Sequence, residues 1–185
     1  MAGERKQQIL ESLAKMLESP KREKITTAAL AAKLDVSEAA LYRHFANKAQ
    51  MFEGLIAFIE ETIFGLINKI SSEETEGLRQ VQRIVNMLLL FAEKNPGMTR
   101  VLIGDALVNE DEKLQLRINQ LYDRIEVTLK QSLRIAETQG HQQRNAEAQA
   151  NLIICYVIGR WHQYAKSGFK RKPTEFALNQ LPSLL

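Results

Sequence analysis

The sequence predicts an all-α protein in two parts, a small N-terminal head of three helices and a larger helical domain. Apolar residues recur at helical spacing along the 185 residues, without convincing strand alternation or an internal repeat. The chain has only four prolines and nine glycines, few enough to permit long helices. Its length suits one head and one domain with its own core, so we divide it into residues 1–47 and 48–185.

The head begins with an amphipathic helix that closes a three-helix unit. The apolar stripe of this helix is formed by Ile9, Leu10, Leu13, Met16 and Leu17. We expect it to end near Ser19 and Pro20, with residues 21–24 as the connecting loop.

Residues 26–48, TTAALAAKLDVSEAALYRHFANK, predict two short helices joined by a tight turn. Thr26 or Thr27 can cap the first helix, over residues 27–34, and Asp35 tolerates the left-handed backbone that a helix-ending turn requires. Ser37 can cap the second helix. In that helix Ala40, Leu41 and Phe45 would face inward, and the outward face would hold Glu38, Ala39, Tyr42, Arg43 and His44.

A second helix presented in this way can enter the major groove of DNA. Small Ala39 and Ala40 would allow close approach to base edges, and residues 1–50 carry the whole formal net charge of +3. Tyr42, His44 and Lys48 could bond phosphates. The predicted DNA-binding residues are Thr26, Thr27, Ser37, Glu38, Ala39, Ala40, Tyr42, Arg43, His44 and Lys48. The alternative is a plain helix crossing in which Tyr42 and His44 are ordinary surface residues.

Beyond the head the sequence predicts long helices separated by polar or helix-breaking residues. The expected helices cover residues 48–70, 78–94, 96–108, 114–137, 145–166 and 176–181. Residues 71–77 form a turn, 95–97 break the chain sharply, 110–112 form an acidic linker and Gly140 ends a helix. The short helix over 176–181 docks back on the body, and basic residues 170–172 form a solvated end.

The helix over residues 145–166 is apolar on two faces, so one face should meet a second copy of the chain. We therefore expect a homodimer with a four-helix interface. Cys155, the single cysteine, should be a buried small hydrophobe, and Trp161 a core aromatic. Tyr164 is placed one turn from Trp161.

Catalysis, cofactors and membrane insertion are not expected. The sequence has no phosphate-binding glycine loop, no HExxH and no nucleophile motif, and His44, His141 and His162 lack metal-ligand spacing. No apolar run approaches the length of a membrane span. We expect a cytoplasmic protein that is not an enzyme and binds neither cofactor nor metal.

LYRHF followed by Asn47 and Lys48 closely resembles the DNA-binding domain of TetR-family regulators. The stretches SEAALYRHF, KAQMFEGLIAFIEE, EKNPGMTRVLIGDAL, RINQLYDRIE and FKRKPT are similar to the nucleoid-occlusion branch of that family. This similarity spans nearly the whole chain. It implies a TetR-like homodimer that presents two heads to a palindromic DNA site on the nucleoid, with one or several dimers on each site.

The resemblance also implies a protein partner, the division protein FtsZ, whose ring assembly would be inhibited over the chromosome. In this branch a groove between the fourth and fifth helices receives the C-terminal tail of FtsZ. The matching positions are Phe58, Met87, Leu90, Lys94 and Asn95. The branch pattern has arginine at the positions of Leu66 and Lys94 and glycine at the position of Leu90. This chain departs from the pattern at all three, so a bulkier and less basic groove is expected.

Two alternatives remain for the larger domain. Phe58, Met87 and Leu90 could each be simple core residues. The chain could also be a TetR-type repressor that releases DNA when a small molecule enters a cavity in the domain. Candidate lining residues for such a cavity are Asn86, Arg100, Tyr122 and Trp161.

Overall fold

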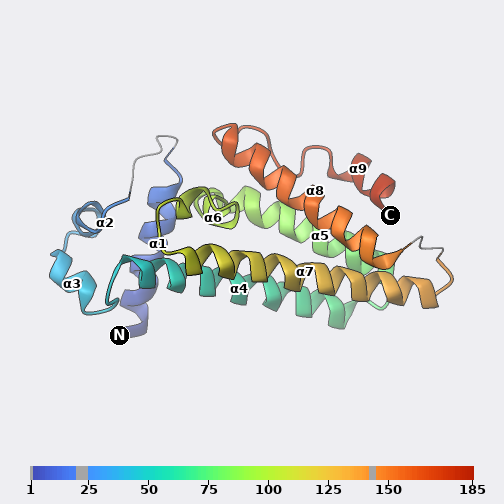
Figure 1. Ribbon diagram of the computed structural model, residues 1–185, viewed down its shortest axis with the longest axis horizontal. Coiled ribbons are helices and arrows are strands. Elements are labelled where there is room, and N and C mark those ends of the chain that lie inside the picture. Colours follow the sequence, from blue (N-terminus) through green and yellow to red (C-terminus); the bar gives the residue numbers. More distant parts are fainter. Residues whose placement is uncertain (1, 20–24, 142–144) are drawn as a thin grey trace.

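The computed structural model describes residues 2–19, 25–141 and 145–185, and all regular structure in these ranges is helical (Figure 1). The order is α1 (Ala2–Leu17), α2 (Thr27–Lys33), α3 (Glu38–Tyr42), α4 (Lys48–Glu73), α5 (Gly77–Lys94), α6 (Pro96–Leu102), the 3-10 helix η1 (Asp105–Leu107), α7 (Glu112–Thr138), α8 (Ala146–Lys166) and α9 (Ala177–Leu184). The predicted all-α class is confirmed. The loop expected over residues 21–24, with Pro20, lies outside the described residues.

Helices α1 to α3 form the head at one end of the molecule, and α4 to α9 form an elongated body (Figure 1). The caps expected from the sequence are present. Thr26 Oγ1 accepts from the Ala29 N–H at 3.1 Å, and Ser37 Oγ accepts from the Ala40 N–H at 3.2 Å. Asp35 has φ 54°, the left-handed backbone that the turn requires.

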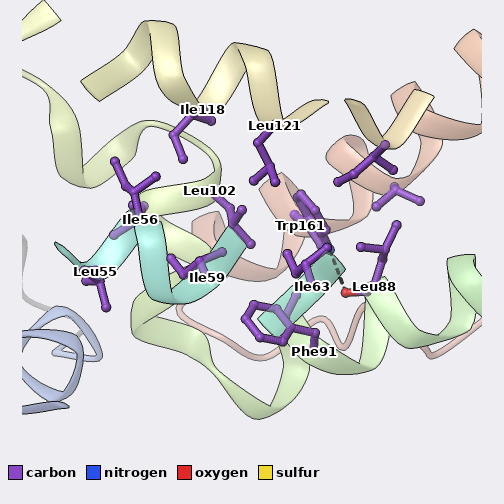
Figure 2. Close-up of a cluster of buried hydrophobic side chains, with 14 of the residues drawn as sticks. Leu55, Ile56, Ile59, Ile63, Leu88, Phe91, Leu102, Ile118, Leu121 and Trp161 are labelled. Carbon is purple, nitrogen blue, oxygen red and sulfur yellow. Dashed lines mark hydrogen bonds between the residues drawn. The ribbon is translucent and has the colours of Figure 1, made fainter. Parts of the chain in front are cut away.

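The body is organised around α4, which packs against α5 and α7, while α8 covers α5 and α7 from another side. Figure 2 shows Ile59 and Ile63 of α4 in the same apolar cluster as Leu121 of α7 and Trp161 of α8. Trp161 is fully buried, and its Nε1 donates to the Leu88 carbonyl at 3.1 Å, which satisfies its one polar group. The prediction of a core tryptophan is confirmed.

The head is attached to the body through α4 and α6, both of which pack against α1. A Cβ at Gly97 would lie 1.9 Å from the Ala14 carbonyl oxygen, so glycine is required for this close approach of the two backbones. Buried Arg100 on α6 donates from Nη1 to the Leu17 carbonyl at 3.2 Å, which satisfies a carbonyl at the C-terminal end of α1.

Arg100 also ties this junction to the last long helix. Its Nε donates to Asp105 Oδ2 at 3.0 Å, and Lys166 near the end of α8 donates to Oδ1 of the same carboxylate. Burial raises the pKa of Asp105, but the hydrogen bonds from Lys166 and Arg100 outweigh it and hold that pKa below its usual value. A continuous set of polar contacts therefore runs from α1 through α6 and η1 to α8.

Several helix boundaries differ from the sequence prediction. Helix α3 ends at Tyr42, before the Arg43, His44 and Phe45 that were expected to lie on it, and α9 continues beyond residue 181 to Leu184. Helix α4 continues to Glu73, into the segment expected to be a turn, and the break comes only at residues 74–76. Helix α6 ends at Leu102 instead of near residue 108, because Gly104 adopts φ 76° and the chain turns into η1. Among the described helices, none is both long and apolar enough to cross a bilayer.

Candidate nucleic-acid interface and apolar groove

The residues predicted to bind DNA lie on α2 and its N-cap, on α3 and the turns before and after it, and at the start of α4 (Figure 1). Their side chains are exposed or half-buried, so none is lost to the core. The exposed members are Thr26, Ser37, Glu38, Ala39, Tyr42 and Arg43; the half-buried members are Thr27, Ala40, His44 and Lys48. Leu41 and Phe45 are buried beneath this surface as predicted, whereas Ala40 is only half-buried.

Three of these side chains form a hydrogen-bonded chain across the two helices. Thr27 Oγ1 lies 2.6 Å from Glu38 Oε2, and Tyr42 Oη lies 3.3 Å from Thr27 Oγ1. A carboxylate only accepts, so the Thr27 hydroxyl must donate to Glu38, and Tyr42 must then donate to Thr27. Sequence reasoning named all three residues but missed these contacts, because they join positions far apart in the motif.

Lys48, the first residue of α4, is paired with an acidic residue of the body. Its Nζ contacts Oε1 of Glu110, with the side chains 22% and 13% exposed, and lies 5.6 Å from the ring centroid of Phe52. Asn47 caps α4 by accepting from the Gln50 N–H at 2.9 Å. The lysine expected to meet phosphate is therefore held by Glu110 in the described structure, and one N–H of the first turn of α4 is already bonded.

The side chains suggested for a ligand cavity lie in three different surroundings. Arg100 lines a hollow of about 300 Å³ between head and body, together with Lys48 and Glu110. Tyr122 and Trp161 are core neighbours with ring centroids 6.3 Å apart, and the Tyr122 hydroxyl donates to the Leu102 carbonyl. Burial raises the pKa of Tyr122. Asn86 is exposed on α5.

The residues predicted to line a groove lie on α4, on α5 and directly after α5, and these two helices pack against each other. Phe58 is 42% exposed and Leu90 42% exposed, so the alternative that they are core residues is wrong. Met87 is half-buried at the edge of the core, and Lys94 is exposed. Half-buried Asn95 caps the end of α5, where its Nδ2 donates to the Phe91 carbonyl at 2.8 Å.

Leu66, a position where the chain departs from the branch pattern, is also exposed, at 40%. Phe58 additionally borders a mainly apolar hollow of about 350 Å³ between α1 and α4, lined also by Leu10, Ala57 and Met98. Exposed apolar side chains are therefore present on both α4 and α5, and Phe58 also borders the hollow beside the first helix of the head.

A second exposed apolar surface lies on α7 and α8, the pair with the most extensive mutual packing in the body. Val127 of α7 and Leu152 of α8 are about half exposed, at 48% and 52%. Cys155 and Gly159 continue the exposed face of α8 at helical spacing. The prediction that Cys155 is buried is wrong within one chain, because its side of α8 faces away from the core.

Comparison with known proteins gives the same organisation. Residues 23–55 match the family of bacterial regulatory proteins, tetR family, and residues 75–185 match the SlmA-like, tetracyclin repressor-like C-terminal domain. The crystal structure of the MbdR regulator from Azoarcus sp. CIB has a TM-score of 0.81 at 16% identity, and the match covers 100% of this chain and 97% of MbdR. That likeness establishes the fold alone.

Curated relatives are much closer in sequence. The nucleoid occlusion factor SlmA of Alteromonas mediterranea is 53% identical over 173 residues, which cover 92% of this chain and 89% of the relative. The nucleoid occlusion factor SlmA of Shewanella amazonensis is 50% identical over 174 residues, with 92% and 88% of the two chains covered. These relatives and the two domain matches are DNA-binding regulators, not enzymes, and the chain belongs to the SlmA branch of the TetR family.

Proposed function

We propose that this protein is a nucleoid occlusion factor, a DNA-bound dimer that inhibits FtsZ ring assembly over the chromosome. The observation that carries the proposal is the pairing of two solvent-facing surfaces on one chain. One is the helix-turn-helix of the head, and the other is the exposed Phe58 and Leu90 surface of the body. The curated name of relatives about half identical over nine-tenths of the chain supports the same reading.

For DNA, the proposal assigns base contacts to the N-terminal part of α3 and phosphate contacts to its flanks. Glu38, Ala39 and Ala40 would face base edges. The phosphates of the DNA backbone would be contacted by Arg43, His44, Lys48 and the N-terminus of α4. Tyr42 would join them once its hydroxyl leaves Thr27. Thr26 and Ser37 would mainly hold their helices in place, since their oxygens already serve as caps.

For the partner, the proposal places the FtsZ C-terminal tail along α4 and α5. An amphipathic or extended peptide can bury apolar side chains against Phe58, Met87 and Leu90, and Lys94 would attract its acidic residues. Leu66 and Leu90 add apolar bulk to this groove, so affinity would depend more on burial and less on charge than in a groove rich in arginine.

For assembly, the proposal pairs α7 and α8 of two copies in a four-helix interface. The exposed faces around Val127 and Leu152 would be covered, and Cys155 would be buried only in the dimer. Two heads related by a two-fold axis would then address a palindromic site.

The test uses a labelled peptide with the sequence of the host FtsZ tail. A duplex is first selected from a random library with the purified full-length protein, and peptide binding is then measured by anisotropy with and without that duplex. We expect saturable binding that Phe58→Ala and Lys94→Glu weaken. Leu178→Ala on α9 is the matched control, because Leu178 is 84% exposed and distant in sequence from the groove.

Absence of peptide binding in both states would refute the partner assignment. Failure to select any duplex would refute DNA recognition. The two outcomes are independent, so each part of the proposal stands or falls by its own result.

A further inference from the structure

Glu38 is an unusual residue for a DNA-reading surface, because a carboxylate repels phosphates. It lies exposed at the first position of α3, the helix that would enter the major groove. Its charge weakens attraction to every duplex. The helix dipole favours an acidic residue in this first turn of α3. For DNA binding, however, the carboxylate helps only where it gains a contact that depends on the base sequence.

The Thr27 hydroxyl fixes the orientation of this carboxylate. The 2.6 Å bond from Thr27 Oγ1 occupies Glu38 Oε2, and within the described residues Oε1 has no hydrogen-bond partner. Thr27 is itself held by the fold, because it begins α2 and its backbone follows the capping residue Thr26. A glutamate side chain normally samples several rotamers, and this bond reduces that freedom before DNA arrives.

The chemistry of the free oxygen selects one base. In the major groove only cytosine N4 and adenine N6 donate hydrogen bonds, and guanine and thymine offer acceptors that a carboxylate would repel. Adenine places its N7 acceptor beside N6, so it suits an amide with one donor and one acceptor. Cytosine presents its amino group without an acceptor on the same base edge, and this matches an acceptor-only carboxylate.

We propose that Glu38 selects cytosine at one position of each half-site and that Thr27 is the positioning residue that aims its carboxylate. This inference rests on the proposed DNA-binding function and deepens it by naming the base. The Tyr42 hydroxyl donates to Thr27 Oγ1 at 3.3 Å and so supports the orientation of Thr27.

The first arm of the test compares duplexes selected from a random library by the wild type and by Glu38→Gln. The wild type should select cytosine at one position per half-site, and the glutamine variant should change its preference there, toward adenine, with other positions unchanged. Replacing that cytosine should weaken wild-type binding about tenfold in anisotropy. Glu38→Gln should lose this discrimination and bind unrelated DNA more tightly, because one negative charge has gone.

The second arm separates positioning from simple folding. Thr27→Val keeps the side-chain shape but removes the hydroxyl, so cytosine discrimination should fall while the melting temperature stays the same. Thr27→Ser restores the hydroxyl and should restore discrimination. In the Glu38→Gln background, Thr27→Val should have no further effect on base preference.

Selection of the same sequence by wild type and Glu38→Gln would overturn the inference and leave DNA recognition intact. Equal cytosine discrimination in Thr27→Val and wild type would overturn the positioning role. If the wild type selects no sequence at all, the inference and the proposed function both fail.

Discussion

The contact between Lys48 and Glu110 leads to a quantitative prediction about DNA affinity. In the free protein the Lys48 ammonium is paired with a body carboxylate and largely shielded from solvent. If Lys48 moves to a phosphate on binding, this pair must break in each head. Removing the charge of Glu110 should therefore strengthen DNA binding, because the cost of breaking the pair disappears.

The magnitude follows from the burial of the pair. Two unit charges 4 Å apart attract by about 4 kcal/mol at the effective dielectric constant of a protein surface. Both side chains are mostly buried, at 22% and 13% exposed, so lost hydration cancels much of this attraction. A net cost of about 1 to 2 kcal/mol per head remains, which corresponds to a gain of about 5- to 30-fold in affinity for each head of Glu110→Gln.

The assay is fluorescence anisotropy on a selected duplex at several salt concentrations. Glu112→Gln is the matched control, because Glu112 is exposed two residues away and carries the same charge. It should give only the small gain expected from lower net negative charge. The Lys48→Ala change should abolish the gain of Glu110→Gln and flatten the salt dependence. Equal affinities for Glu110→Gln and Glu112→Gln would refute the reasoning.

Three further perturbations test the junction and the dimer. Gly97→Ala should destabilise the protein by about 2 to 3 kcal/mol in urea unfolding, because the new methyl meets a backbone carbonyl of α1 at 1.9 Å. Gly65→Ala is the control: its methyl meets nothing within 4 Å, so it should stabilise the helix slightly. Asp105 has a lowered pKa in the folded protein, so its stabilising effect is present at neutral pH and is lost as the pH falls below about 4 and through the folded pKa. The Asp105→Asn protein should therefore be less stable than the wild type at pH 7, and its free energy of unfolding should fall less on acidification. Leu152→Glu should yield monomers in light scattering and weaken DNA binding. The control Leu178→Glu on α9 should leave the dimer intact. A dimeric Leu152→Glu protein would rule out the α8 interface.

The local features of the head could be predicted from the sequence because their causes lie within a few residues. The left-handed backbone at Asp35 and the cap by Ser37 depend on side chains that bond their own turn. The burial of Leu41 follows from helical spacing, whereas Phe45 is buried although α3 has already ended at Tyr42. These features place the candidate reading surface with little help from the rest of the fold.

The polar contacts that control the surface could not be predicted in the same way. Glu110 was expected to lie in an acidic linker, and only the packing of the body brings it to Lys48, 62 residues earlier. Cys155 was expected to be buried because it sits in an apolar run, yet composition alone does not say which side of α8 meets the core. Long-range partner choice and the buried side of a two-faced helix both require the tertiary arrangement.

The contacts from Leu17 through Arg100 and Asp105 to Lys166 have a consequence for the geometry of the operator. They join the end of α1 in the head to the end of α8. In a dimer paired through α8, each head would then be fixed relative to the two-fold axis by side chains of its own chain. The distance between recognition helices would be set before DNA arrives, and the protein would tolerate few changes in the number of base pairs between half-sites.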